Sequence, residues 1–179
     1  MPGVQRLDIT DLPEIQSLDS KKVVAAKLEA ARERVSDIDE RIILVDDVSL
    51  TFDQSHGFPG PLVRWLIDSG GKDGGPRALY KYGTSTGSRR AFLSAHIGLC
   101  GAAIKNLLFF EGRLMGTFGP PCEHPEKDSK EIDRIFKPNG SHVYLGQMSW
   151  QERTEINHRA IALRKVRAYL EREVGYQFP

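Results

Sequence analysis

An α/β fold is predicted from three observations on this sequence. The continuous apolar run Arg41–Val45 is bounded by two acids, which is typical of a strand buried on both faces. Residues 91–118 contain runs of strand-forming side chains, and the segment after Asn157 carries an amphipathic helical stripe. A chain of 179 residues is long enough for one folded unit with a substantial buried core.

The amino-terminal third predicts a short strand, a turn and a helix. The strand is expected near Arg6–Ile9. Pro13 then interrupts regular structure and leaves Glu14 on a turn. Ser20 is a suitable N-cap for a helix that continues to about Arg34, with apolar residues along one side.

The next segment predicts a buried strand followed by a turn and a short helix. The strand Arg41–Val45 is expected to end at Asp46-Asp47, and ligands gather at the carboxyl ends of strands in open α/β sheets. Gly57–Pro61 forms a rigid turn that leads into a helix from about Pro61 to Ser69. Gly70–Pro76 is expected to be a flexible loop.

The middle of the chain predicts antiparallel strands. Ala91–Leu99 and Lys105–Phe110 have strand character, and Glu111-Gly112 is expected to form a tight hairpin into a strand Arg113–Phe118. Near the carboxyl end, Ser149 and Glu152 have capping-box spacing. Asn157 is expected to cap a final helix whose apolar stripe is Leu163, Val166, Tyr169, Leu170 and Val174.

The overall charge excludes two broad classes of partner. Lys and Arg number 25 and Asp and Glu number 24, so the formal net charge is +1 and no global field attracts nucleic acid or an anionic membrane. The two cysteines and the polar first residues, with no long apolar stretch, lead us to expect a cytoplasmic protein without a signal peptide or membrane span.

Several short motifs occur together in a specific order. They are Asp11-Leu12-Pro13-Glu14, Val45-Asp46-Asp47-Val48-Ser49-Leu50, Phe58-Pro59-Gly60-Pro61, Phe110-Glu111-Gly112-Arg113, Phe136-Lys137-Pro138-Asn139-Gly140, and Glu152-Arg153 leading to Asn157-His158-Arg159. In this order and spacing the chain resembles the inosine triphosphate pyrophosphatase family, which cleaves inosine and xanthosine triphosphates to the monophosphate and pyrophosphate with Mg²⁺.

The resemblance implies a two-lobed fold with an elongated mixed sheet, flanking helices and an active-site cleft between the lobes. A single domain would span 1–179, with one lobe from about 1–70 and 141–179 and the other from about 77–140. It also implies a purine nucleotide ligand and a homodimer. The same resemblance implies that this chain is an enzyme, a nucleotide pyrophosphohydrolase.

The resemblance assigns the metal site to two carboxylates. Glu14 matches a metal-binding glutamate, and Asp47 matches the aspartate that binds metal and accepts a proton. Oxygen ligands suit Mg²⁺, which bridges carboxylates to phosphates. By charge pattern alone, Glu14 would be a solvated loop carboxylate and Asp47 an acid at a strand end. The paired match favours the metal site for Asp47.

The remaining matches are expected to bind substrate: Lys27, Val48, Arg64, Asp133, Arg153, His158 and Arg159. Arg153 stands where the family has a phosphate-contacting lysine. The positive charge is kept, but a planar guanidinium replaces a compact ammonium. Arg159 is expected to help read the purine 6-oxo group. The alternative to substrate binding is that Lys27 and Arg64 are charged side chains on the solvated faces of helices. For His158-Arg159 the alternative is an ordinary surface pair.

Two departures from the family pattern leave the function open. Lys130, Glu131, Ile132 and Arg134 surround Asp133 where the family has an aromatic base pocket, and the family's first strand and Thr-Gly-Asn phosphate loop have no counterpart. Loss of that strand is expected to expose a sheet edge unless another segment of the chain or a partner subunit covers it. Three interpretations remain: a pyrophosphatase, a related protein that binds without turnover, or an enzyme for another phosphorylated substrate.

Overall fold

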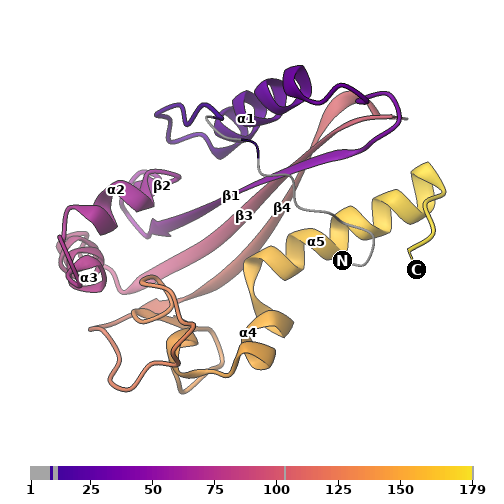
Figure 1. The fold of residues 1–179 in the computed structure, drawn as a ribbon. Helices are drawn as coiled ribbons and strands as arrows, with labels where there is room; N and C mark the ends of the chain where they lie inside the picture. The colour runs from indigo at the N-terminus through magenta and orange to yellow at the C-terminus, as the bar shows by residue number, and fades with distance from the viewer. Residues whose placement is uncertain (1–8, 10–11, 103, 179) are drawn as a thin grey trace.

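The computed structural model describes residue 9, residues 12–102 and residues 104–178, which form an α/β fold (Figure 1). The described strands are β1 (Ile43–Phe52), β2 (Pro59–Gly60), β3 (Arg90–Gly101), β4 (Ile104–Phe118) and β5 (Phe136–Pro138). The described helices are α1 (Ser20–Arg34), α2 (Val63–Asp68), α3 (Gly75–Ser85), α4 (Trp150–Ile156) and α5 (His158–Tyr169), with short helical turns η1 (Leu145–Gln147) and η2 (Leu170–Val174). The predicted fold class is confirmed.

The sheet has the strand order β2-β1-β3-β4-β5, and each pairing between described strands is antiparallel. A mixed sheet was expected, but none of the described strands pairs in parallel. The long strands β1, β3 and β4 run through the length of the molecule (Figure 1). β2 pairs with β1 only at Leu50 and Thr51, so the part of β1 from Ile43 to Ser49 has no described strand beside it on that edge.

Helices cover the two faces of the long strands (Figure 1). On one face α1 packs against β1 and β3, and its Leu28 and Ala31 join Ile43 and Cys100 in a buried cluster. On the other face α5 packs against β3 and β4. α2 and α3 pack against each other near one end of the sheet, beside a larger cluster that includes Phe52. The sheet therefore separates the environments of α1 and α5.

α1 begins as predicted to within one residue. Asp19 is the N-cap, and its carboxylate accepts a hydrogen bond from the Lys21 backbone N–H. Ser20, expected as the cap, is instead the first helical residue, and its hydroxyl lies 2.9 Å from the Ser49 hydroxyl on β1. This buried contact joins the start of α1 to the middle of β1.

β1 is longer than the predicted strand. Asp46 and Asp47 lie in its interior and not at its end, because the strand continues to Phe52 while paired with β3. Acidic residues are unfavourable in most strands, which explains the mistaken boundary. Of the strand expected near Arg6–Ile9, only Ile9 lies within the described residues.

The predicted hairpin at Glu111-Gly112 is wrong, since both residues lie inside the continuous strand β4. A Cβ atom on Gly112 would lie 2.0 Å from the carbonyl oxygen of His158 and 2.4 Å from the backbone nitrogen of Ala162. The glycine is therefore needed for the close approach of α5 to β4. The chain instead reverses after Gly101, which has a φ of 97°.

The predicted loop Gly70–Pro76 is only partly correct, because α3 begins at Gly75 with Pro76 in its first turn. α3 is held by burial, with Leu79 fully buried and Gly83 against Phe52 and Phe118. The capping box at the start of α4 and the Asn157 cap of α5 are confirmed. Among the helices in the described ranges, none has the length and apolar character needed to cross a bilayer.

Candidate functional site

Three of the residues expected in the site form an ionic cluster. The Lys27 ammonium on α1 donates a hydrogen bond of 2.9 Å to the Asp47 carboxylate on β1 and lies 3.2 Å from a carboxylate oxygen of Glu14. Glu14 comes from the irregular segment that precedes α1, and its side chain is 80% exposed. The side chains of Lys27 and Asp47 are only 14% and 12% exposed. The cluster thus joins two buried groups to one in solvent.

Burial controls the electrostatics of Asp47. Desolvation raises the pKa of Asp47 above its usual value, against the hydrogen bond and the charge of Lys27, which lower it. Burial also opposes the charged form of Lys27, but its contacts with Asp47 and Glu14 outweigh burial and leave the pKa of Lys27 raised. None of the described residues donates a hydrogen bond to the second, buried Asp47 oxygen, Oδ2. This oxygen is an available ligand for a cation.

A cavity of about 330 Å³ lies beside the ionic cluster. Val48 and Arg64 line it, so five of the predicted site residues meet there. Arg64 is paired with Asp68 one helical turn away, at 3.0 Å. The other lining residues are mostly apolar: Ile15, Val23, Pro61, Leu62, Val63 and Trp65. The cavity therefore has one charged wall and one apolar wall.

Arg159 lies on the opposite face of the sheet. Its Nε atom contacts the Asp46 carboxylate at 2.5 Å. His158 begins α5, and burial lowers its pKa to about 4, assisted by the neighbouring Arg159 charge. His158 is therefore neutral at pH 7. A neutral His158 can donate or accept a hydrogen bond but adds no positive charge to the site.

Asp133 and Arg153 form a third group. The Arg153 guanidinium is buried between two carboxylates, in contact with Asp128 and 3.7 Å from Asp133. Burial raises the pKa of Asp133, against the backbone hydrogen bond from Lys130 and the charge of Arg153. Arg153 Nη1 is buried with no hydrogen-bond acceptor among the described residues. Asp128 gave no signal in the sequence, because its contact with Arg153 requires the folded chain.

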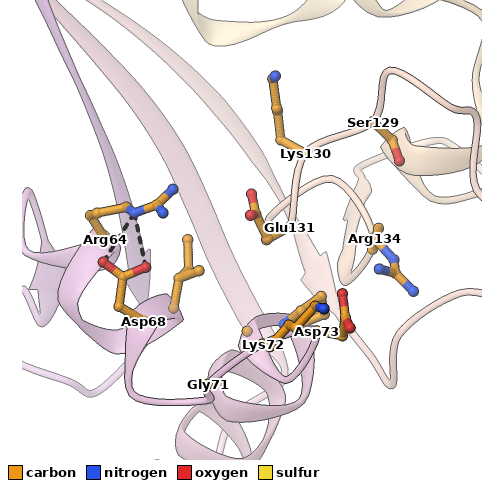
Figure 2. Close-up of a pocket in the computed structure, with 12 residues that line it drawn as sticks. Arg64, Asp68, Gly71, Lys72, Asp73, Ser129, Lys130, Glu131 and Arg134 are labelled. Carbon is orange, nitrogen blue, oxygen red and sulfur yellow. Dashed lines mark hydrogen bonds and ion pairs between the residues drawn. The ribbon is translucent and has the colours of Figure 1, made fainter.

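A second cavity of about 850 Å³ adjoins the first at the Arg64–Asp68 pair. Figure 2 shows this pair on one side and Lys130, Glu131 and Arg134 on the other, with Lys72 and Asp73 on the segment below. The altered residues flanking Asp133 thus line a polar cavity. Ile132 does not, because it packs against the apolar core.

Sequence reasoning missed a polar row that crosses three strands. His96 on β3 lies opposite Asp47 in the sheet register, and Glu111 on β4 lies opposite His96, with His96 Nε2 3.9 Å from Glu111. Burial lowers the pKa of His96, whereas the charges of Glu111 and Asp47 raise it. Only the strand register brings these residues together.

The structure thus brings Glu14, Lys27, Val48, Asp47 and Arg64 to one cavity. The other predicted residues lie elsewhere: Arg159 and His158 at the start of α5, and Arg153 with Asp133 between α4 and the segment that precedes β5. Among the described residues, no group of three or more His, Cys, Asp or Glu side chains could hold a metal ion by itself. The protein's share of a metal site at Asp47 would therefore be two carboxylates.

The fold and the cavity define an α/β protein in which a charged wall, with Lys27 and Asp47, faces an apolar wall across a cavity. The family model described as the Ham1 family matches residues 3–169, and the chain belongs to this family. The inosine triphosphate pyrophosphatase of Schizosaccharomyces pombe is 34% identical over 163 residues, which cover 91% of this chain and 80% of the relative. The inosine triphosphate pyrophosphatase of Encephalitozoon intestinalis is 31% identical over 164 residues, covering 89% and 77%.

Solved structures show the same fold. The Ham1 protein of Staphylococcus aureus superposes with a TM-score of 0.73 at 24% identity, covering 93% of this chain and 82% of that chain. The Mycobacterium abscessus protein titled nucleoside-triphosphatase / dITP/XTP pyrophosphatase has a TM-score of 0.64 at 18% identity, covering 89% and 82%.

Proposed function

We propose that this protein is a nucleoside triphosphate pyrophosphatase that hydrolyses inosine- and xanthosine-type triphosphates to the monophosphate and pyrophosphate. The observation that carries the proposal is the buried Asp47 carboxylate, which is held by Lys27 at 2.9 Å and faces a cavity with one oxygen unpaired among the described residues. Two relatives over 30% identical are named inosine triphosphate pyrophosphatases, which favours turnover over binding alone.

The residues present fit a divalent metal ion, and we propose Mg²⁺. Glu14 and Asp47 supply carboxylate oxygens, the ligands that Mg²⁺ prefers, and the unpaired Asp47 Oδ2 provides a free position. Two protein ligands are enough for Mg²⁺, which usually keeps several waters and binds substrate phosphates. When bound, the ion would stabilise negative charge on the phosphate oxygens.

Asp47 would act as the proton acceptor for a water molecule that attacks the α-phosphorus. The new bond joins the water oxygen to the α-phosphorus, the α–β phosphoanhydride bond breaks, and its electron pair leaves with pyrophosphate. The proton passes to Asp47, whose raised pKa makes it a better acceptor than a solvated aspartate. Lys27 orients Asp47 and Glu14, and its raised pKa keeps it charged beside the polyphosphate.

Arg64, Arg153, His158 and Arg159 would bind the rest of the nucleotide. Arg64 lines both cavities, so it is suited to a ligand that extends from one to the other. Arg153 has an unused buried donor at Nη1 among the described contacts. His158, being neutral, would act by hydrogen bonding. A homodimer and a cytoplasmic location belong to the same proposal. The edge of β1 from Ile43 to Ser49, which has no strand beside it among the described residues, supports association.

The test is release of pyrophosphate by the purified protein with Mg²⁺ from inosine, xanthosine and the common nucleoside triphosphates. Asp47→Asn should reduce release by at least about 100-fold, because general-base catalysis typically contributes that much. Asp37→Asn, an acid near the far end of α1, is the matched control and should leave turnover unchanged. Equal turnover in Asp47→Asn, or no release by a folded protein, would overturn the proposal.

A further inference from the structure

The cavity of about 850 Å³ lies on the face of the sheet that carries Asp46 and Arg159. Ile67, which lines this cavity, packs in one buried cluster with Leu50 of β1. Leu50 and Asp46 are an even number of residues apart in a regular strand, so their side chains share a face. A nucleotide held by its phosphates at Asp47 can therefore reach this face through the junction of the two cavities.

Glu131 and Arg134 line this cavity with polar groups that have no partner in the described part of the chain. Both belong to the turns that precede β5, and Figure 2 shows them across the cavity from Arg64 and Asp68. Neither side chain forms an ion pair or a hydrogen bond with another described residue, and the Arg134 Nε atom is buried. A buried donor without an acceptor costs free energy, so Arg134 is suited to a ligand that supplies an acceptor.

The other charged groups around the cavity give it a small positive excess. Arg64 and Asp68 pair with each other at 3.0 Å. The charged side chains that line the cavity without an ion pair among the described residues are Lys72, Asp73, Lys130, Glu131 and Arg134. Three of these five are cations and two are anions. Burial raises the pKa of the Cys122 thiol beside Arg134, so this thiol adds no negative charge near neutral pH. The cavity thus favours a ligand that presents one negative charge.

Xanthine matches Glu131 and Arg134 better than the other purines do. Its N1–H is a donor for the Glu131 carboxylate, and its 2-oxo group and N3 are acceptors for the Arg134 guanidinium. Xanthine in a nucleotide loses the N3 proton below neutral pH, so this edge then carries a negative charge, and a charge-assisted hydrogen bond is the stronger kind. Hypoxanthine has the same N1–H but no 2-oxo group, adenine has no N1–H, and guanine would present an amino donor to the Arg134 donors.

We propose that Glu131 and Arg134 select the base of the bound nucleotide, and that they favour the ionised xanthine of xanthosine triphosphate over hypoxanthine. The inference rests on the proposed function and names the preferred substrate of the same site. Residues 128–135 carry no aromatic side chain, so recognition by this segment depends on hydrogen bonds and charge. Arg159, on the same face of the sheet, is left with the 6-oxo group, which xanthine and hypoxanthine share.

The pH dependence of the preference for xanthosine over inosine tests this assignment in the unaltered protein. The ratio of kcat/KM for xanthosine triphosphate over inosine triphosphate should rise severalfold from mildly acidic to neutral pH, as the ionised fraction of xanthine grows. Protonation of Asp47, Asp133 or another protein group affects both substrates, so its effect largely cancels in the ratio. A ratio that does not change with pH would overturn the inference.

Variants of the two side chains supply the second readout. Arg134→Gln should lower the ratio about tenfold at neutral pH and flatten its pH dependence, because it removes a charge-assisted hydrogen bond. Arg134→Lys keeps the charge and should recover part of the loss. Glu131→Gln should weaken both substrates without lowering the ratio, since both bases have the N1–H. Arg77→Gln, from an exposed arginine of α3 that lines neither cavity, is the matched control and should leave the ratio unchanged.

Binding measurements separate this inference from the proposed function, because they need no turnover. Calorimetry with xanthosine monophosphate and inosine monophosphate should give a lower Kd for the xanthosine form, and Arg134→Gln should remove the difference. That result without turnover of any triphosphate supports the selection and rejects the function. Turnover that depends on Asp47, with equal preference for the two bases in the original protein and in Arg134→Gln, leaves the function in place and rejects the inference.

Discussion

Asp46 and Asp47 are consecutive residues of β1, yet their carboxylates lie on opposite faces of the sheet. Asp47 contacts Lys27 of α1, and Asp46 contacts Arg159 of α5. The separation follows from the alternation of side chains along a strand. A single peptide bond of β1 therefore separates the residue of the proposed metal site, Asp47, from the residue that contacts Arg159, which we propose reads the purine.

Replacing Arg159 should weaken purine discrimination more than phosphate binding. In Arg159→Ala the ratio of kcat/KM for inosine triphosphate over ATP should fall at least about tenfold, because a lost hydrogen bond to the base affects one substrate only. Asp46→Asn should cause a smaller change in the same direction, since Asp46 holds the guanidinium at 2.5 Å. The inhibition constant of pyrophosphate should remain the same in both variants. A uniform loss of affinity for every nucleotide and for pyrophosphate would contradict this assignment.

A methyl group at position 112 should displace α5. The added Cβ of Gly112→Ala would lie 2.0 Å from the His158 carbonyl oxygen, and both contacts closer than 2.5 Å are with backbone atoms of α5, which cannot rotate away. The free energy of unfolding should fall by about 3 kcal/mol, as for overpacked cores, measured by urea denaturation. Gly140→Asn is the control, because space is open there and its φ of 80° suits asparagine. Equal stability of Gly112→Ala and the original protein would show that α5 is not held so closely.

The buried His158 should make stability depend on pH. Its pKa is about 4 in the folded protein, compared with 6.5 for an exposed histidine, so between these values the unfolded chain binds a proton that the folded chain does not. The free energy of unfolding should therefore fall as pH decreases from 6.5 to 4, by up to roughly 3 kcal/mol from this residue. His158→Asn should lose this part of the pH dependence. The control His142→Asn, which replaces an exposed histidine, should retain this pH dependence. If the free energy of unfolding has the same dependence on pH in both variants, the effect does not come from His158.

The buried Arg153 should be required for stability at neutral pH. Arg153→Ala leaves the Asp133 carboxylate without a cation 3.7 Å away, and the free energy of unfolding should fall by about 3 kcal/mol at pH 7. Burial already raises the pKa of Asp133, and removal of the guanidinium should raise it further. The loss should therefore become smaller at acidic pH, where Asp133 is protonated. Arg167→Ala, from an exposed pair with Glu171, should have a much smaller effect. A loss that is the same at both pH values would point to packing of the side chain and not to its charge.

Helix boundaries were predicted well where the signal was local. The Ser149 and Glu152 side chains form the capping box at the start of α4, and Asn157 accepts a hydrogen bond of 2.7 Å from the Ala160 N–H at the start of α5. These contacts span three residues, so spacing alone predicts them. α3 was missed because it begins in a glycine-rich stretch and is stabilised by burial of Leu79 in a distant core.

The candidate site was predicted in part by resemblance. Glu14 and Asp47 were expected to hold a metal ion and Lys27 to bind substrate, and these roles stay predictions; the structure joins the three side chains in two ion pairs. Trp65 was not singled out, because an exposed tryptophan in a helix has no distinctive spacing. Its position at the cavity wall depends on the packing of α2 against the core.

The sequence by itself determined the α/β class, the capped helices and the set of charged residues available for chemistry, because these depend on composition and on contacts within a few residues. The tertiary structure decided that Asp46 and Asp47 lie inside a strand, that Gly112 receives α5 and that Trp65 borders the Asp47 cavity. These features depend on strand register and on packing between residues far apart in the chain. Neither is encoded in local spacing, since both result from burying the apolar faces of α1, α5 and the sheet together.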